Sequence, residues 1–117
     1  MLRPLPIETT EDVLLVPRAT LAKPIGFFAK KLEYELLEGC DDLDYFRALI
    51  FILNDDLIFM LSRHNSQSRN ETVVSLPINI GSSAGIDAAL GRILDELAIP
   101  FRKVIWQEKG NDSRRSA

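Results

Sequence analysis

The chain has 117 residues, of which 46% are hydrophobic and 26% are charged, a composition typical of one globular domain with a substantial core. A net charge of -3 and a pI of about 5.1 exclude the positive field expected of proteins that bind nucleic acid or acidic lipid. With a single cysteine, Cys40, no intrachain disulfide can form. We expect a small acidic cytoplasmic protein without a secretory or membrane-spanning segment.

The N-terminal part of the chain is expected to contribute little regular structure. Residues 1–12 contain two prolines and are predicted to form an extended arm. Residues 13–16 are apolar and predict a short edge strand that ends before Pro17.

Residues 24–38 fit two different elements. Apolar residues recur at helical spacing between Pro24, which suits a first helical turn, and Gly39, which suits the position after a helix. Residues 32–36, in contrast, alternate between apolar and polar as a strand does. We favour the helix because both terminal signals agree with it.

The next segment predicts a hairpin, with strands at residues 45–53 and 57–63 and a turn at residues 54–56. The odd-numbered and the even-numbered residues of each strand, which point to opposite faces of the sheet, are both apolar, and this is typical of strands covered on both faces. If the helices gather on one face of the sheet, the other face needs a cover. The N-terminal arm, a second copy of the chain or a bound apolar ligand could supply it. We expect a homodimer, and the predicted interface residues are Leu49, Phe51, Leu53, Phe59 and Leu61.

The C-terminal half predicts a strand, a helix and a strand. Residues 72–80 form the first strand, in which Pro77 indicates an edge or a bulge. A helix then runs from a serine cap to about Ala98 and is stopped by Pro100. Residues 101–107 form the last strand, which could complete a parallel crossover with residues 72–80. Residues 108–117 lack large apolar side chains and are expected to be disordered.

Together these elements predict an α+β fold, with a mostly antiparallel sheet of four to five strands and one or two helices packed on one face. The order is roughly α-β-β-β-α-β, with the domain spanning residues 13–107. This order of elements, and nothing beyond it, is similar to that of double-stranded RNA-binding domains and of small acidic dimeric chaperones of type III secretion. Arg92 is the only base of the predicted helix at residues 83–98, a departure from the lysine-rich helix of the RNA-binding domains. RNA binding is therefore not expected.

The residues that could carry chemistry form no local signature, and neither a metal nor a cofactor is predicted. The acidic segment between residues 33 and 44 lacks the ligand spacing of a calcium loop and is interpreted as a solvated surface that could meet a basic partner. His64 is the only histidine, and a catalytic site would have to combine it with Ser62, Ser66 or Cys40 outside any known local motif. Acidic neighbours of Cys40 argue against a reactive thiolate.

The strongest small-ligand candidate in the sequence is the small-residue segment at residues 80–85. It joins a strand to a helix N-terminus, where backbone N–H groups can bind an anion, although it equally suits a tight turn and a cap. We expect Ser82, Ser83, His64 and Arg102 to line such a pocket.

Two functional hypotheses follow. The first is a homodimeric, non-catalytic interaction or chaperone-like module. The alternative is a small-ligand-binding domain or small enzyme with a pocket between sheet and helix near residues 81–85.

Overall fold

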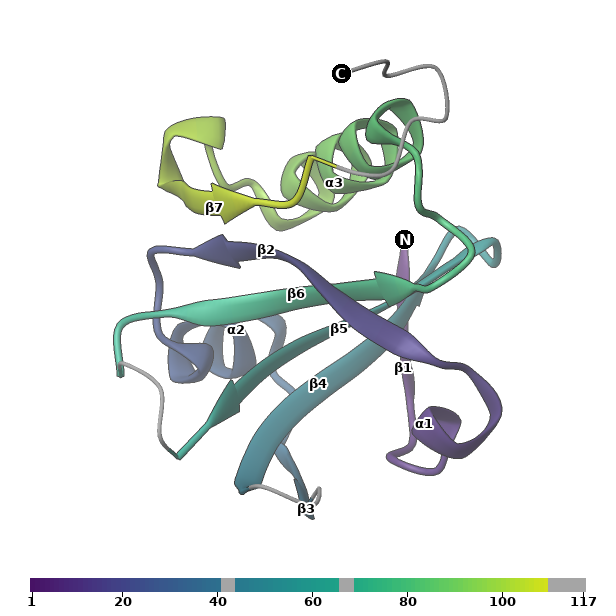
Figure 1. Ribbon diagram of the computed structural model, residues 1–117. Coiled ribbons are helices and arrows are strands. Elements are labelled where there is room, and N and C mark those ends of the chain that lie inside the picture. Colours follow the sequence, from purple (N-terminus) through teal and green to yellow (C-terminus); the bar gives the residue numbers. More distant parts are fainter. Residues whose placement is uncertain (41–43, 66–68, 110–117) are drawn as a thin grey trace.

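Residues 1–40, 44–65 and 69–109 are described by a computed structural model, in which one antiparallel sheet carries two longer helices (Figure 1). In chain order the elements are β1 (Leu2–Leu5), α1 (Thr9–Asp12), β2 (Leu15–Leu21), α2 (Ile25–Leu32), β3 (Leu37–Cys40), β4 (Tyr45–Leu53), β5 (Leu57–His64), β6 (Thr72–Pro77), α3 (Ser83–Leu97), the 3-10 turn η1 (Phe101–Lys103) and β7 (Val104–Gln107).

The described residues form seven strands and three helices, which corrects the expectation of four to five strands and one or two helices. The additional strands, β1 and β3, have four residues each, which is too short for a sequence period to reveal them. Both pair with the same edge of β4. β1 lies opposite residues 50–53 and β3 lies opposite residues 45–48.

The N-terminal segment is part of the sheet and of its cover. Residues 1–12, expected as an extended arm, hold β1 and α1. The expected edge strand at residues 13–16 is instead the longer β2, which continues through Pro17 and lies between β6 and β7. A register shift between Pro17 and Ala19 accommodates the proline, because a bulge tolerates a residue without an N–H.

The sheet order is β1-β4-β5-β6-β2-β7, with β3 beside β4. β6 and β7 are both antiparallel to β2 and therefore run parallel to each other. The β6–α3–β7 unit is thus the crossover expected from the sequence, with β2 inserted between its two strands (Figure 1).

The hairpin turn between β4 and β5 follows from its residue types. Asn54 and Asp55 have φ values of 51° and 62°, and the Asp56 N–H donates to the Leu53 carbonyl at 3.1 Å. Two consecutive left-handed residues define the type I′ geometry whose twist matches the flanking strands, and Asn and Asp adopt it readily.

Helix α2 is shorter than the sequence suggested. It ends at Leu32, because Glu33 takes a left-handed conformation (φ 60°) and its N–H donates to the Ala29 carbonyl. β3 then begins at Leu37, so the segment predicted as one helix is divided between a helix and a strand. The strand-like alternation at residues 32–36 lies between the end of α2 at Leu32 and the start of β3 at Leu37, so it indicates a change from helix to strand but not where the strand begins.

Helix α3 is the element that the sequence predicted best. The Ser82 hydroxyl accepts a hydrogen bond from the Gly85 N–H at 3.0 Å, which satisfies one free donor of the first turn. At the other end the Lys31 ammonium of α2 donates to the Leu97 carbonyl at 2.6 Å. A cation at this position complements the negative end of the helix dipole.

The core lies between α2, α3 and one face of the sheet. It contains Phe28 of α2, the apolar stripe of α3 and the odd-numbered apolar residues of β4 and β5. The five residues predicted as a dimer interface (Leu49, Phe51, Leu53, Phe59 and Leu61) all belong to this core and are buried within one chain. The helices therefore cover the sheet face that was assigned to a second copy.

Candidate functional site

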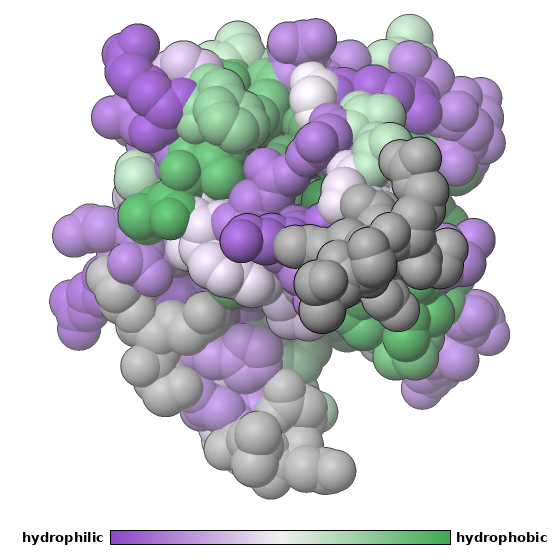
Figure 2. Space-filling model, turned by 45° about the horizontal axis from the view of Figure 1, so that its top comes forward, coloured by the Kyte–Doolittle hydropathy of each residue, from purple (hydrophilic) through white to green (hydrophobic). Residues whose placement is uncertain are grey.

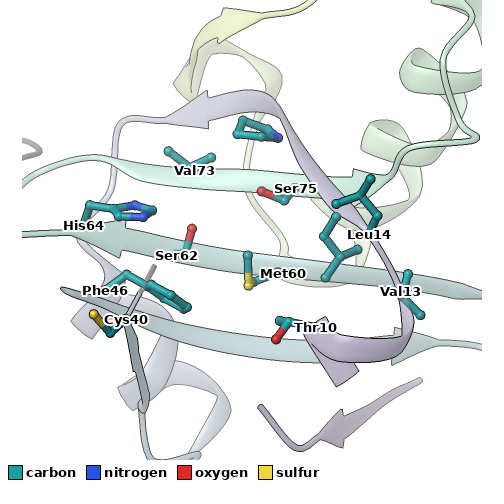
Figure 3. A pocket seen from close by; sticks show the side chains of 12 residues that line it. Thr10, Val13, Leu14, Cys40, Phe46, Met60, Ser62, His64, Val73 and Ser75 are labelled. Carbon is teal, nitrogen blue, oxygen red and sulfur yellow. The ribbon is translucent and has the colours of Figure 1, made fainter. Parts of the chain in front are cut away.

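The second face of the sheet, opposite the α2–α3 core, carries a groove of about 400 Å³ (Figure 3). Its floor comes from β5 and β6, one wall from the segment between α1 and β2, and one end from β3 and β4. The described lining residues are Thr10, Val13, Leu14, Leu15, Pro17, Cys40, Phe46, Met60, Ser62, His64, Val73 and Ser75. The N-terminal segment covers part of this apolar face, and the groove is the part it leaves open.

Two serines place polar atoms in the otherwise apolar floor. Ser62 of β5 and Ser75 of β6 are each 2% exposed, and they alternate along their strands with the core residues Leu61 and Val74. Within the described part of the chain neither hydroxyl makes a hydrogen bond to protein, and neither oxygen is fully buried, so both are accessible to water from the groove. A bound ligand with a hydrogen-bonding group can therefore replace water as the partner of these hydroxyls.

One end of the groove is aromatic. Phe46 of β4 and His64 of β5 face each other in the β4–β5 register, with ring centroids 5.2 Å apart and ring planes inclined by 40°. Gly39 of β3 lies opposite Phe46, and a β-carbon there would stand only 2.9 Å from the Phe46 Cε1 and Cε2 atoms. The absent side chain of Gly39 therefore provides the space that the Phe46 ring occupies.

The other end of the groove is aliphatic. Val13 and Leu14 from the turn between α1 and β2 stand beside Met60 of β5 in Figure 3. Leu14 is 62% exposed and forms the outer lip. Among the described lining residues there is no Asp, Glu, Lys or Arg. A groove of this kind favours a neutral ligand over an ion, because none of these lining side chains carries a charge that would compensate an ion for its lost hydration.

The ligand site expected near residues 81–85 is divided between separate parts of the structure. Ser82 caps α3, the Ser83 hydroxyl donates to the Lys109 carbonyl, and Arg102 lies exposed on η1. Only His64 of the four expected residues lines the groove. The C-terminal end of β7 crosses the start of α3, where the Gln107 amide also donates to the Asp87 carboxylate.

Three residues that the sequence offered for a catalytic site, Cys40, Ser62 and His64, line the groove. Cys40 and His64 line the same end of the groove, whereas Ser66 lies outside the described residues. Among the described residues no group of three or more His, Cys, Asp or Glu side chains is arranged to hold a metal. Asp41 and Asp42 of the acidic segment lie outside the described residues. No helix in the described ranges is both long and apolar enough to cross a bilayer.

A clear pKa shift occurs away from the groove, where α3 meets the β4–β5 turn. Arg92 donates to both carboxylate oxygens of Asp56, at 2.6 and 3.2 Å, and these hydrogen bonds lower the pKa of Asp56 below its ordinary value of 3.8. The same bonds raise the pKa of Arg92. This bidentate pair joins the hairpin turn to the helix and is structural.

Several groove residues were not identified from the sequence. Phe46, Met60, Val73 and Ser75 come from three strands, and their proximity depends on strand pairing that no local pattern reveals. The available signal was a serine at a buried position of an apolar strand, seen at Ser62 and again at Ser75. Comparison with protein-family models, with curated protein sequences and with solved structures finds no match for this chain.

Proposed function

We propose that this protein is a non-catalytic binding protein for a small, neutral, largely apolar molecule with a hydrogen-bonding group, which occupies the groove on the second face of the sheet. The observation that carries the proposal is the pair of unpartnered hydroxyls, on Ser62 and Ser75, on the floor of an apolar groove of about 400 Å³. Small-molecule sites typically have volumes of about 300–1,000 Å³ and combine apolar walls with a few convergent polar groups.

The charge of the groove supports a neutral ligand. Its described lining contributes three hydroxyls, an imidazole and a thiol, and no carboxylate, ammonium or guanidinium group. A phosphate or carboxylate ligand would gain no ion pair there, whereas an alcohol, ketone or amide would exchange water for the serine hydroxyls at little cost.

The test uses a neutral saturated alcohol, decahydro-2-naphthol, in isothermal titration calorimetry. We expect saturable one-to-one binding to the wild-type chain. Leu14→Asp at the groove lip should weaken binding at least about tenfold, because an apolar contact becomes a hydrated charge. Ile78→Asp is the matched control: Ile78 is 52% exposed, close to the 62% of Leu14, and does not line the groove. Equal loss in both variants, or no binding to wild type, would contradict the proposal.

A second proposal is a homodimeric interaction module, now with a different surface from the five core residues. Phe101, Ile105 and Trp106 are 68%, 55% and 47% exposed, and they lie on η1 and on β7 at the edge of the sheet. Figure 2, seen from the side of α3 and β7, shows hydrophobic residues gathered on part of this face. Exposed apolar side chains beside an unpaired sheet edge are candidate contact residues. Sedimentation velocity of wild type and Ile105→Lys tests it: a dimer that the substitution dissociates is expected, and a wild-type monomer at high concentration contradicts it.

A further inference from the structure

We infer that the ligand of the groove carries an aromatic ring, which packs against Phe46 and His64 while its polar group reaches Ser62. The inference rests on the proposed function and specifies the chemical class of the ligand. It is drawn from the different character of the two ends of the groove, aromatic where β4 and β5 place Phe46 and His64 and aliphatic at the α1–β2 turn (Figure 3).

The aromatic end is held in place by the pairing of three strands. Phe46 is opposite Gly39 on one side and opposite His64 on the other, so its ring lies between two fixed neighbours. The two rings are 5.2 Å apart and inclined by 40°, within the range of favourable aromatic pairs. Because both also line the groove, a third ring entering there finds a stacking surface already formed.

Gly39 makes this arrangement possible. A β-carbon at residue 39 would overlap the outer edge of the Phe46 ring, 2.9 Å from its Cε atoms. Any larger residue would displace the ring from β3 toward the groove or toward His64. Gly39 is thus a positioning residue, which sets the place of the stacking surface without contacting the ligand.

The polar floor fixes the other requirement on the ligand. Ser62 and His64 are two residues apart on β5 and point to the same face, so their α-carbons are separated by about 6–7 Å. A molecule of two fused rings spans this distance, with one ring at Phe46 and His64 and a hydroxyl or carbonyl at Ser62. The groove therefore fits a neutral bicyclic aromatic alcohol or ketone better than a linear acyl chain.

The experiment compares two probes that share a skeleton and a hydroxyl group, 2-naphthol and decahydro-2-naphthol, in calorimetric titrations of the folded protein. Aromatic contacts add free energy beyond the apolar area buried, so 2-naphthol should bind wild type about three- to tenfold more tightly. Phe46→Leu keeps an apolar side chain but removes the ring. It should reduce this ratio to near one while leaving the decahydro-2-naphthol affinity within about twofold.

Gly39→Ala provides an independent variant in which the Phe46 ring is present but displaced. Its ratio of affinities should also fall toward one, and thermal denaturation of both variants verifies that they are folded at the titration temperature. Should Gly39→Ala not fold, the Phe46→Leu ratio decides alone. Equal binding of the two probes to wild type, or an unchanged ratio in Phe46→Leu, would overturn the inference while leaving the proposed function intact. Absence of binding by both probes would overturn the proposed function itself.

Discussion

The position of Phe51 in the core leads to a prediction that separates a monomer core from a dimer interface. The Phe51 side chain is 0% exposed, with ring centroids 5.5 Å from Tyr34 and 5.7 Å from Phe59. Phe51→Ala removes the buried ring and two aromatic contacts and leaves a cavity beneath α2 and α3. Such truncations cost about 3–5 kcal/mol, a large part of the roughly 5–15 kcal/mol that stabilises a domain of this size.

The assay is urea denaturation followed by circular dichroism at two protein concentrations. With an m value of about 1–3 kcal/mol/M, the midpoint should fall by on the order of 2 M, equally at both concentrations. Ile52→Ala is the control, because Ile52 is the adjacent residue, half-buried on the other face of the sheet, and its truncation should cost less. Phe51→Asp should give unfolded protein. A soluble, folded Phe51→Asp monomer would refute the placement of Phe51 in the core of a single chain.

Three further predictions concern the groove floor and the contacts that hold the helices. Ser75→Ala should leave the free energy of unfolding unchanged or slightly higher, since the Ser75 hydroxyl has no protein partner in the described chain. The same substitution should weaken decahydro-2-naphthol binding about two- to tenfold in calorimetry. Lower stability together with intact binding would contradict this prediction. Asp56 has a lowered pKa in the folded state, so its contribution to stability is fully present above pH 3.8 and is lost as the pH falls through the lower folded value. Asp56→Asn should therefore flatten the acid limb of the melting-temperature profile, and so should Arg92→Ala, whereas a wild-type slope in both variants would rule out the linkage. Lys31→Met removes the cation at the C-terminal end of α3 and should lower the free energy of unfolding by about 0.3–1 kcal/mol in urea denaturation. Lys30→Met, at the exposed neighbouring residue, should leave the free energy of unfolding unchanged. Equal effects of the two substitutions would contradict the capping role of Lys31.

Local signals in the sequence were sufficient to predict those elements whose ends are set by residues within or next to them. The serine cap and Pro100 delimit α3, and the Asn54-Asp55 turn fixes the hairpin, so both were predicted within one residue of the observed bounds. The strand-helix-strand crossover was also expected. The insertion of β2 into it was not, because pairing between residues 15–21 and two strands far along the chain has no local signature.

The cover of the hairpin could not be decided from its apolar pattern. Both parities of β4 are apolar, and the pattern correctly indicates that both faces are largely covered. It does not say whether the cover is a helix of the same chain, the N-terminal segment or another molecule. In the structure α2 and α3 cover one face of the sheet, and the α1–β2 segment covers part of the other face. The groove is the part of that second face that remains uncovered.

The candidate site was only partly accessible from the sequence for the same reason. His64 is the lone histidine of the sequence, and the small residues at the start of a predicted helix favour a pocket that would join it to Ser82, Ser83 and Arg102. In the structure its neighbour is Phe46, which is brought to it by the register of β4 and β5. Side chains that meet through strand pairing become visible only when the register is known.

Backbone amide correlation NMR of the full chain, recorded during titration with decahydro-2-naphthol, would locate a bound neutral ligand on the molecule. We predict saturating shifts at the amides of Ser62, His64, Val73 and Ser75 and at the α1–β2 turn, with the exposed residues of η1 and β7 unaffected. Shifts confined to η1 and β7, or no saturating shifts at the groove amides, would contradict the claim that the second face of the sheet is a ligand site.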